Sequence, residues 1–96
     1  MEITVESNLR IQGMFEPPIN LTFDGSHISL LDVLTSLQKM CKSIELVNKN
    51  NELGDDIDEV FVNEKRHFVS RMPAGCILSD GDRVKIEIGF APLGGG

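Results

Sequence analysis

The group with the clearest chemical potential in this sequence is the carboxylate at its carboxyl end. The chain ends in Leu93-Gly94-Gly95-Gly96, and a terminal carboxyl has a pKa of about 3.5, so at neutral pH it is an anion that can act as a nucleophile. Glycine has no Cβ and adopts backbone conformations that other residues avoid, so this tail could enter a narrow channel. The competing interpretation is a frayed end or a remnant of cloning.

The other reactive side chains form no recognisable catalytic set. The sequence has no G-x-x-x-x-G-K loop, no Ser–His–Asp or Cys–His combination and no cluster of metal ligands. Cys41 and Cys76 form no C-x-x-C pair, and Cys41 is expected to be a buried structural thiol. His27 and His67 are expected on the surface. We therefore expect no metal, no bound cofactor and no catalysis by this chain itself.

Length and charge narrow the classes of partner. At 96 residues the chain forms one compact domain. Its formal net charge is −6, and its lysines and arginines are scattered among acids, whereas nucleic-acid binding needs a basic stripe. The expected partner is a protein with a basic surface. No apolar run approaches the ~18 residues of a membrane span, and the first residues lack a signal-peptide pattern, so we expect a cytoplasmic protein without membrane contact.

The first half of the sequence predicts a β-hairpin and then a helix. Apolar residues share one parity over residues 2–11 and again over 19–23, with a long Pro-rich turn between them, as in two half-buried strands. Ser29-Leu30-Leu31-Asp32 matches a capping box that starts a helix at Ser29. Over residues 30–43 apolar side chains recur every three or four positions, which predicts one buried helix face. They are Leu30, Val33, Leu34, Leu37, Met40 and Cys41, followed by Ile44.

The second half predicts a loop followed by short strands. Residues 48–56 are polar and are interpreted as a surface loop that tolerates change. A strand over residues 57–62, a tight turn at Asn63-Glu64-Lys65 and a short strand over 66–69 follow. The Asp80-Gly81-Asp82 turn precedes a last strand in which Val84, Ile86 and Ile88 alternate with charged residues.

This order of elements defines the fold class. A hairpin, one helix and further strands suit an α+β fold, with a mixed sheet of four to five strands and one main helix packed across one face. A β-grasp has that order. We assign residues 1–88 to the β-grasp domain and residues 89–96 to a flexible carboxyl-terminal tail.

Two motifs in the second half carry a family resemblance. They read VFVNEKRHF and CILSDGDRVKIEIGFAPLGGG. The first is similar to the V.VNG strand and turn, and the second to the L.DGD.V.I.PP..GG ending, of ubiquitin-like sulfur carriers of the MoaD/ThiS type. The sequence departs from that pattern at Glu64, where the family usually has glycine, at Gly89-Phe90, where paired prolines are frequent, and in its Pro-rich first hairpin. These departures leave the subfamily open.

The resemblance implies chemistry at Gly96 and a role as the protein cosubstrate or small subunit of a partner enzyme. In such a protein the terminal glycine is adenylated and then converted to a thiocarboxylate, and Gly95, Gly94 and Leu93 are recognised as the tail enters the activating site. The partners implied are a ubiquitin-activating-type adenylating enzyme, which uses ATP and Mg, and a sulfur-accepting synthase such as the molybdopterin synthase large subunit. The sulfur serves molybdopterin, tungstopterin, thiamine or tRNA thiolation. Two alternatives stay open: a ubiquitin-like modifier joined through Gly96 to target lysines, and an interaction domain without terminal chemistry.

The folded domain is also expected to contact the partner, because ordering residues 93–96 costs about 4–8 kcal/mol. Phe61 has the parity opposite to Val60 and Val62, which places it on the sheet face away from the helix. An exposed aromatic residue there is a docking candidate. Phe90 either extends the same patch or packs in the core with the last strand.

Overall fold

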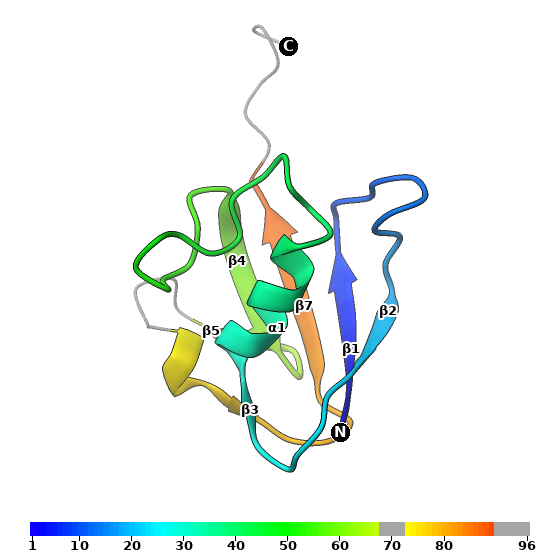
Figure 1. The fold of residues 1–96 in the computed structure, drawn as a ribbon, viewed down its shortest axis with the longest axis vertical. Coiled ribbons are helices and arrows are strands. Elements are labelled where there is room, and N and C mark those ends of the chain that lie inside the picture. The colour runs from blue at the N-terminus through cyan, green and yellow to red at the C-terminus, as the bar shows by residue number, and fades with distance from the viewer. Residues whose placement is uncertain (68–72, 90–96) are drawn as a thin grey trace, which may run out of the picture.

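The computed structural model describes residues 1–67 and 73–89, and it contains a mixed five-stranded sheet with one helix across one face (Figure 1). The α+β class, the mixed sheet and the single main helix predicted from the sequence are confirmed. In chain order the elements are β1 (Glu2–Ser7), β2 (Ile19–Thr22), β3 (Ile28–Ser29), α1 (Leu30–Gln38), β4 (Ile57–Val62), β5 (Lys65–His67), a short 3₁₀ helix η1 (Pro73–Gly75), β6 (Ile77–Leu78) and β7 (Arg83–Ile88).

Strands β1 and β7 form the centre of the sheet. The strand order is β2-β1-β7-β4-β5, in which β1 and β7 are parallel and the other neighbours are antiparallel. Parallel strands need a long crossover connection, usually a helix, on one face of the sheet. Helix α1 lies in that connection and covers one face. In the sheet, β7 pairs with β1 on one side and with β4 on the other, so it is the middle strand.

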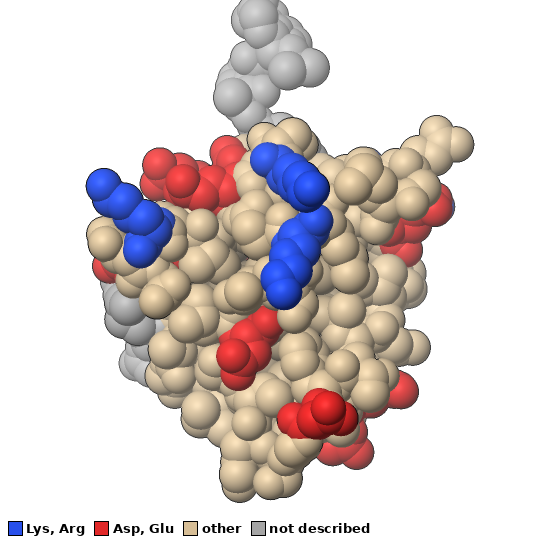
Figure 2. All heavy atoms as spheres, in the orientation of Figure 1, with Lys and Arg blue, Asp and Glu red and all other residues tan. Residues whose placement is uncertain are grey.

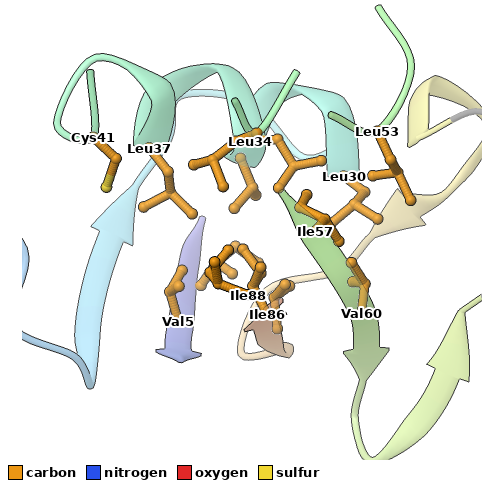
Figure 3. Close-up of a cluster of buried hydrophobic side chains, with 14 of the residues drawn as sticks. Val5, Leu30, Leu34, Leu37, Cys41, Leu53, Ile57, Val60, Ile86 and Ile88 are labelled. Atoms are coloured by element: carbon orange, nitrogen blue, oxygen red, sulfur yellow. The ribbon is translucent and has the colours of Figure 1, made fainter. Parts of the chain in front are cut away.

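The core lies between α1 and the sheet (Figure 3). Leu30, Leu34 and Leu37 of α1 have no exposed surface. Burying an apolar side chain of this size contributes about 1.5–3 kcal/mol, so this interface is the main source of stability. The sheet residues that meet them are Ile3 and Val5 of β1, Ile57 and Val60 of β4, and Val84, Ile86 and Ile88 of β7.

Helix α1 begins at the predicted capping box. The Ser29 hydroxyl accepts a hydrogen bond from the Asp32 backbone N–H at 3.2 Å, and the Asp32 carboxylate accepts one from the Ser29 N–H at 2.8 Å. A cap of this kind stabilises a helix by roughly 1 kcal/mol. The predicted apolar stripe is also found, because Leu30, Val33, Leu34 and Leu37 are all buried.

The helix ends at Gln38, several residues earlier than predicted. The side-chain amide of Gln38 binds the chain that follows: Nε2 donates to the carbonyls of Cys41 and Ile44 at 2.9 and 2.7 Å. Its Oε1 accepts from the N–H groups of Leu46 and Val47 at 2.7 and 3.1 Å. Backbone groups that would otherwise lack partners are thereby satisfied by one side chain, and Cys41 is still buried as predicted.

The first strand is shorter than the predicted range 2–11. It ends at Ser7, whose hydroxyl accepts a hydrogen bond from the Leu9 N–H at 3.0 Å where the chain bends out of the sheet. Leu9 still reaches the core, and Ile11 pairs with Phe15 across a tight turn. The prediction was wrong beyond Ser7 because the loop buries Leu9 in phase with the strand, so the alternation continues after the strand has ended.

The β4–β5 hairpin has a shorter turn than predicted. Asn63 and Glu64 form it with φ values of 50° and 71°, the left-handed pair of a type I′ turn. Lys65 belongs to β5 and pairs with Val62. The two-residue turn sets the register of the hairpin, and Glu64 has a backbone conformation that glycine adopts at lower cost.

The connection between α1 and β4 is only partly a tolerant surface loop. Leu53 is buried, and a Cβ on Gly54 would clash with the backbone of Glu45. The Gly54 N–H donates to the Leu46 carbonyl at 2.9 Å, which holds the two segments together. The prediction that all of residues 48–56 tolerate change is therefore wrong at Leu53 and Gly54, because polar composition does not reveal a single anchor or a close backbone approach.

A second, two-stranded sheet pairs β3 with β6. Strands of two residues are too short to be recognised by alternation, so the sequence did not predict it. The Asp80-Gly81-Asp82 turn precedes β7 as predicted, and Gly81 has a φ of 86°, which glycine tolerates. In residues 1–67 and 73–89, no helix has the length and apolar character that crossing a membrane requires.

Candidate functional site

Most of the candidate residues lie outside the described part of the chain. Phe90, Leu93, Gly94, Gly95 and Gly96 fall beyond residues 1–67 and 73–89, so their roles stay predictions. The structure does describe the strand that leads to them and the surface around Phe61.

The carboxyl end of β7 is held from both sides. On the β1 side, the side-chain amide of Asn8 binds both polar backbone groups of Ile88: Nδ2 donates to the carbonyl at 2.9 Å, and Oδ1 accepts from the N–H at 2.8 Å. On the β4 side, the Gly89 N–H donates to the carbonyl of Asp56 at 2.9 Å. The last two residues before Phe90 are therefore anchored.

This anchored end lies at the edge of the sheet opposite the amino terminus (Figure 1). Because β1 and β7 are parallel, their carboxyl ends lie at the same edge. The β1–β2 and α1–β4 connections also lie there. The chain consequently reaches residue 90 from the middle strand of the sheet, between two loops.

Phe61 lies on the sheet face away from α1, as its parity predicts. Val60 is fully buried in the core, whereas Phe61 is half-buried and lies outside the core cluster. Arg66 Cζ lies 6.0 Å and Lys85 Nζ 5.9 Å from the centroid of its ring. Both distances fall within the range of cation–π contacts. The open face thus presents an aromatic ring between two basic side chains.

A cleft of about 360 Å³ opens beside this ring. Its lining residues come from β1, β4, β7 and the β4–β5 turn, which the sheet register brings together. They are Glu6, Phe61, Glu64, Arg83 and Lys85. An aromatic ring among acids and bases suits side chains of another protein better than a wholly apolar ligand.

The basic groups of this open face are paired with acids. The pairs are Arg66 with Glu59 at 3.2 Å, Arg83 with Glu64 at 3.2 Å and Lys85 with Glu87 at 3.7 Å. Exposed pairs of this kind contribute about 0–1 kcal/mol each to stability. Each pair is neutral as a unit, and Glu6 adds a further carboxylate to the lining of the cleft. Charged groups of both signs are spread over the opposite, helix side (Figure 2).

Sequence reasoning missed Arg66 and Lys85 as neighbours of Phe61. A signal for Arg66 existed, because a two-residue turn places Phe61 opposite Arg66 in the hairpin. Reading the turn as three residues hides that register. Lys85 faces Phe61 only because β7 pairs with β4, which no local pattern indicates.

Neither cysteine is arranged for nucleophilic chemistry. Burial raises the pKa of the Cys41 thiol, and burial, followed by the Asp82 carboxylate, raises the pKa of the Cys76 thiol. A raised pKa lowers the fraction of thiolate at neutral pH, and the thiolate is the reactive form. Within the described ranges, no three His, Cys, Asp or Glu residues gather into a metal-binding group.

Comparison with solved structures identifies the fold. The chain is similar to the Haloferax volcanii HVO 2177 protein in solution, with a TM-score of 0.69 and 21% identity over 95% of this chain and 85% of that chain. It is also similar to the crystal structure of SAMP1 from Haloferax volcanii, with a TM-score of 0.64 and 19% identity over 100% of both chains. The fold is the ubiquitin-like β-grasp.

At these identities the likeness concerns the fold. No protein-family model matches the sequence, and neither does any curated protein. The two solved structures confirm the predicted β-grasp architecture, and the chemistry predicted for the carboxyl end stays a prediction.

Proposed function

We propose that this protein is a sulfur carrier of the MoaD/ThiS type whose terminal glycine is activated by a partner enzyme. The observation that carries the proposal is the place of the glycine ending in the fold. Gly94-Gly95-Gly96 follows, by a short segment, the central strand β7 of a ubiquitin-like β-grasp. That strand ends in anchored residues, so the domain offers a fixed base for a tail that enters another protein's active site.

The proposed reaction takes place in two steps at Gly96. A carboxylate oxygen attacks the α-phosphorus of ATP, and pyrophosphate leaves. A sulfide-equivalent donor on the partner's side then attacks the carbonyl carbon of the acyl-adenylate, and AMP leaves with the original oxygen. The product is a thiocarboxylate, a stronger nucleophile than a carboxylate. ATP and Mg belong to a ubiquitin-activating-type adenylating enzyme, and this chain contributes the reacting group.

Docking by the folded domain offsets the cost of ordering the tail. Fixing Leu93 to Gly96 in an extended form costs about 4–8 kcal/mol, which tail contacts alone supply poorly. We assign the docking contact to Phe61 and its cleft on the open face, with Phe90 as a further contact. Because the basic groups beside Phe61 are paired with acids, we expect this contact to depend on apolar burial more than on long-range attraction.

The thiocarboxylate is proposed to deliver sulfur to a second partner, a sulfur-accepting synthase such as the molybdopterin synthase large subunit. Biosynthesis of molybdopterin, tungstopterin or thiamine and thiolation of tRNA all need sulfur in this form. A cytoplasmic setting, where ATP is present, fits each of these uses.

A second candidate function uses the same activation. In it, the adenylated Gly96 is conjugated to lysines of other proteins. SAMP1, one of the two fold neighbours, is a ubiquitin-like small archaeal modifier. The two functions separate by product, which is a thiocarboxylate on the free protein in one case and an isopeptide bond to a target lysine in the other.

The experiment combines ATP–pyrophosphate exchange with intact-mass measurement. Exchange by the source organism's adenylating enzyme is expected with the chain that ends at Gly96 and should disappear when residues are added after Gly96. Protein isolated from its own cells should be heavier by the mass difference between sulfur and oxygen. Equal exchange by the extended chain would refute both the sulfur-carrier and the modifier function and would favour an interaction domain without terminal chemistry. A mass ladder of lysine conjugates would favour the modifier function.

A further inference from the structure

We propose that Asn8 is a positioning residue for the reaction at Gly96. Its side-chain amide takes the place of a neighbouring strand at the end of β7 and fixes the direction in which the chain leaves the sheet. This inference rests on the proposed function, because the placement of the chain at the end of β7 matters only if the tail enters a partner's active site.

The geometry begins with the point at which β1 leaves the sheet. The parallel ladder pairs Thr4 with Arg83 and continues to Ser7, which pairs with Ile86. Beyond Ser7 the chain bends away, so on this flank Ile88 has no backbone neighbour in a β1 strand. A primary amide offers the same donor and acceptor as a peptide group. The bonds of 2.9 and 2.8 Å from Asn8 therefore continue the ladder by one step with a side chain.

The other flank of β7 is held independently. The Gly89 N–H donates to the Asp56 carbonyl at 2.9 Å, and a Cβ on Gly89 would lie 3.4 Å from the Asp58 Cβ. With both flanks engaged, the backbone at Ile88 and Gly89 is held from two directions. With Asn8 removed, it is held from the β4 side alone and can pivot about that attachment.

The consequence for activation follows from the conformational freedom of the residues that lead into the tail. In the wild-type protein Ile88 and Gly89 are already held in place when the tail binds. Without Asn8 they also have to be ordered on binding, so only the fraction of molecules in which the base is correctly placed binds productively. Apparent affinity falls in proportion to that fraction. Once the tail is seated, the chemistry at Gly96 is unchanged.

The test uses the full chain and the source organism's adenylating enzyme in ATP–pyrophosphate exchange. Asn8→Ala removes two hydrogen bonds and is expected to raise KM for the protein about 5- to 30-fold, the factor that corresponds to two net hydrogen bonds, with kcat within about twofold. Asn8→Asp keeps the acceptor but sets a carboxylate against the Ile88 carbonyl, so it should raise KM as well.

Ser29→Ala is the matched control, at the start of α1 on the other face of the sheet. The Ser29 hydroxyl accepts from the Asp32 N–H and donates to the Asp32 carboxylate, both at 3.2 Å, so this variant also removes two hydrogen bonds made by one side chain. Ser29 lines neither the cleft beside Phe61 nor the end of β7. Its melting temperature should fall about as much as that of Asn8→Ala, while its KM stays at the wild-type value.

Amide hydrogen exchange supplies a readout of the geometry itself. In Asn8→Ala the Ile88 amide should exchange on the order of tenfold faster, with the Val84 amide unchanged. The inference is overturned if Ile88 loses protection without a rise in KM, if its exchange does not change, or if Ser29→Ala raises KM equally. If the wild-type protein is not activated at all, the proposed function fails and takes this inference with it. Activation of wild type and Asn8→Ala with equal KM removes this inference alone.

Discussion

Replacing Phe61 by Ala tests whether the open face of the sheet docks the partner. The ring lies outside the core, and its described contacts are two cation–π contacts at 6.0 and 5.9 Å. Exposed contacts of this kind are worth about 0.5–1 kcal/mol each, so Phe61→Ala should reduce the free energy of unfolding by about 1–2 kcal/mol. Truncating a docking aromatic should weaken binding by about 1–3 kcal/mol, which is roughly 5- to 150-fold in Kd.

Val60→Ala is the matched control, one residue earlier on the same strand. Val60 faces the core and has no exposed surface, so removing its two methyl groups should cost roughly 2–3 kcal/mol of stability through lost burial and a cavity. Its side chain points away from the open face, so the Kd of the variant should match that of wild type. Phe61→Ala should therefore be the more stable of the two variants and the weaker binder.

The assay pairs thermal melting with titration calorimetry against the adenylating enzyme. The expected pattern is a small fall in Tm and a large rise in Kd for Phe61→Ala, and the reverse for Val60→Ala. If Phe61→Ala binds like wild type and melts as early as Val60→Ala, the ring acts in packing and the docking assignment is refuted.

Three further predictions address other parts of the molecule. Gly95→Val should melt like wild type but block adenylate formation, because a β-branched side chain clashes in a narrow channel and restricts φ and ψ; full activation would mean that the channel does not fit glycine. Glu64→Gly should raise the free energy of unfolding by about 0.5–1 kcal/mol in urea titration, since φ is 71° there, and a loss would show that the exposed pair with Arg83 matters more than the turn. Gln38→Leu should lower it by about 2–4 kcal/mol, because four hydrogen bonds to backbone groups disappear; near-wild-type unfolding would show that water replaces the amide.

The parts of the fold that local chemistry decides were predictable from the sequence. The capping box at Ser29 needs only two side chains three residues apart, and it starts α1 as predicted. The bounds of β4 and the burial of alternate residues in β7 also follow from local alternation. By contrast, the same alternation overstated β1, because Leu9 is buried from a loop.

The candidate site divides in the same way. The face of Phe61 was predictable, since parity along one strand decides it. Its two cationic neighbours depend on pairing, with Arg66 fixed by the turn length and Lys85 by the position of β7. The roles of Phe90 and of the glycines were read from sequence alone and await the experiments above.

By itself, the sequence determined the order of the longer strands and the helix, the face that each presents to the core and the glycine ending that could carry chemistry, because each depends on residues close together in the chain. Only the tertiary structure decided that β7 lies at the centre of the sheet and that Asn8, 80 residues earlier, binds its last residue. The physical reason is that an exposed asparagine after a strand looks like any solvated residue. Its partner is a backbone group, which every residue has, so no side-chain pattern can point to the contact.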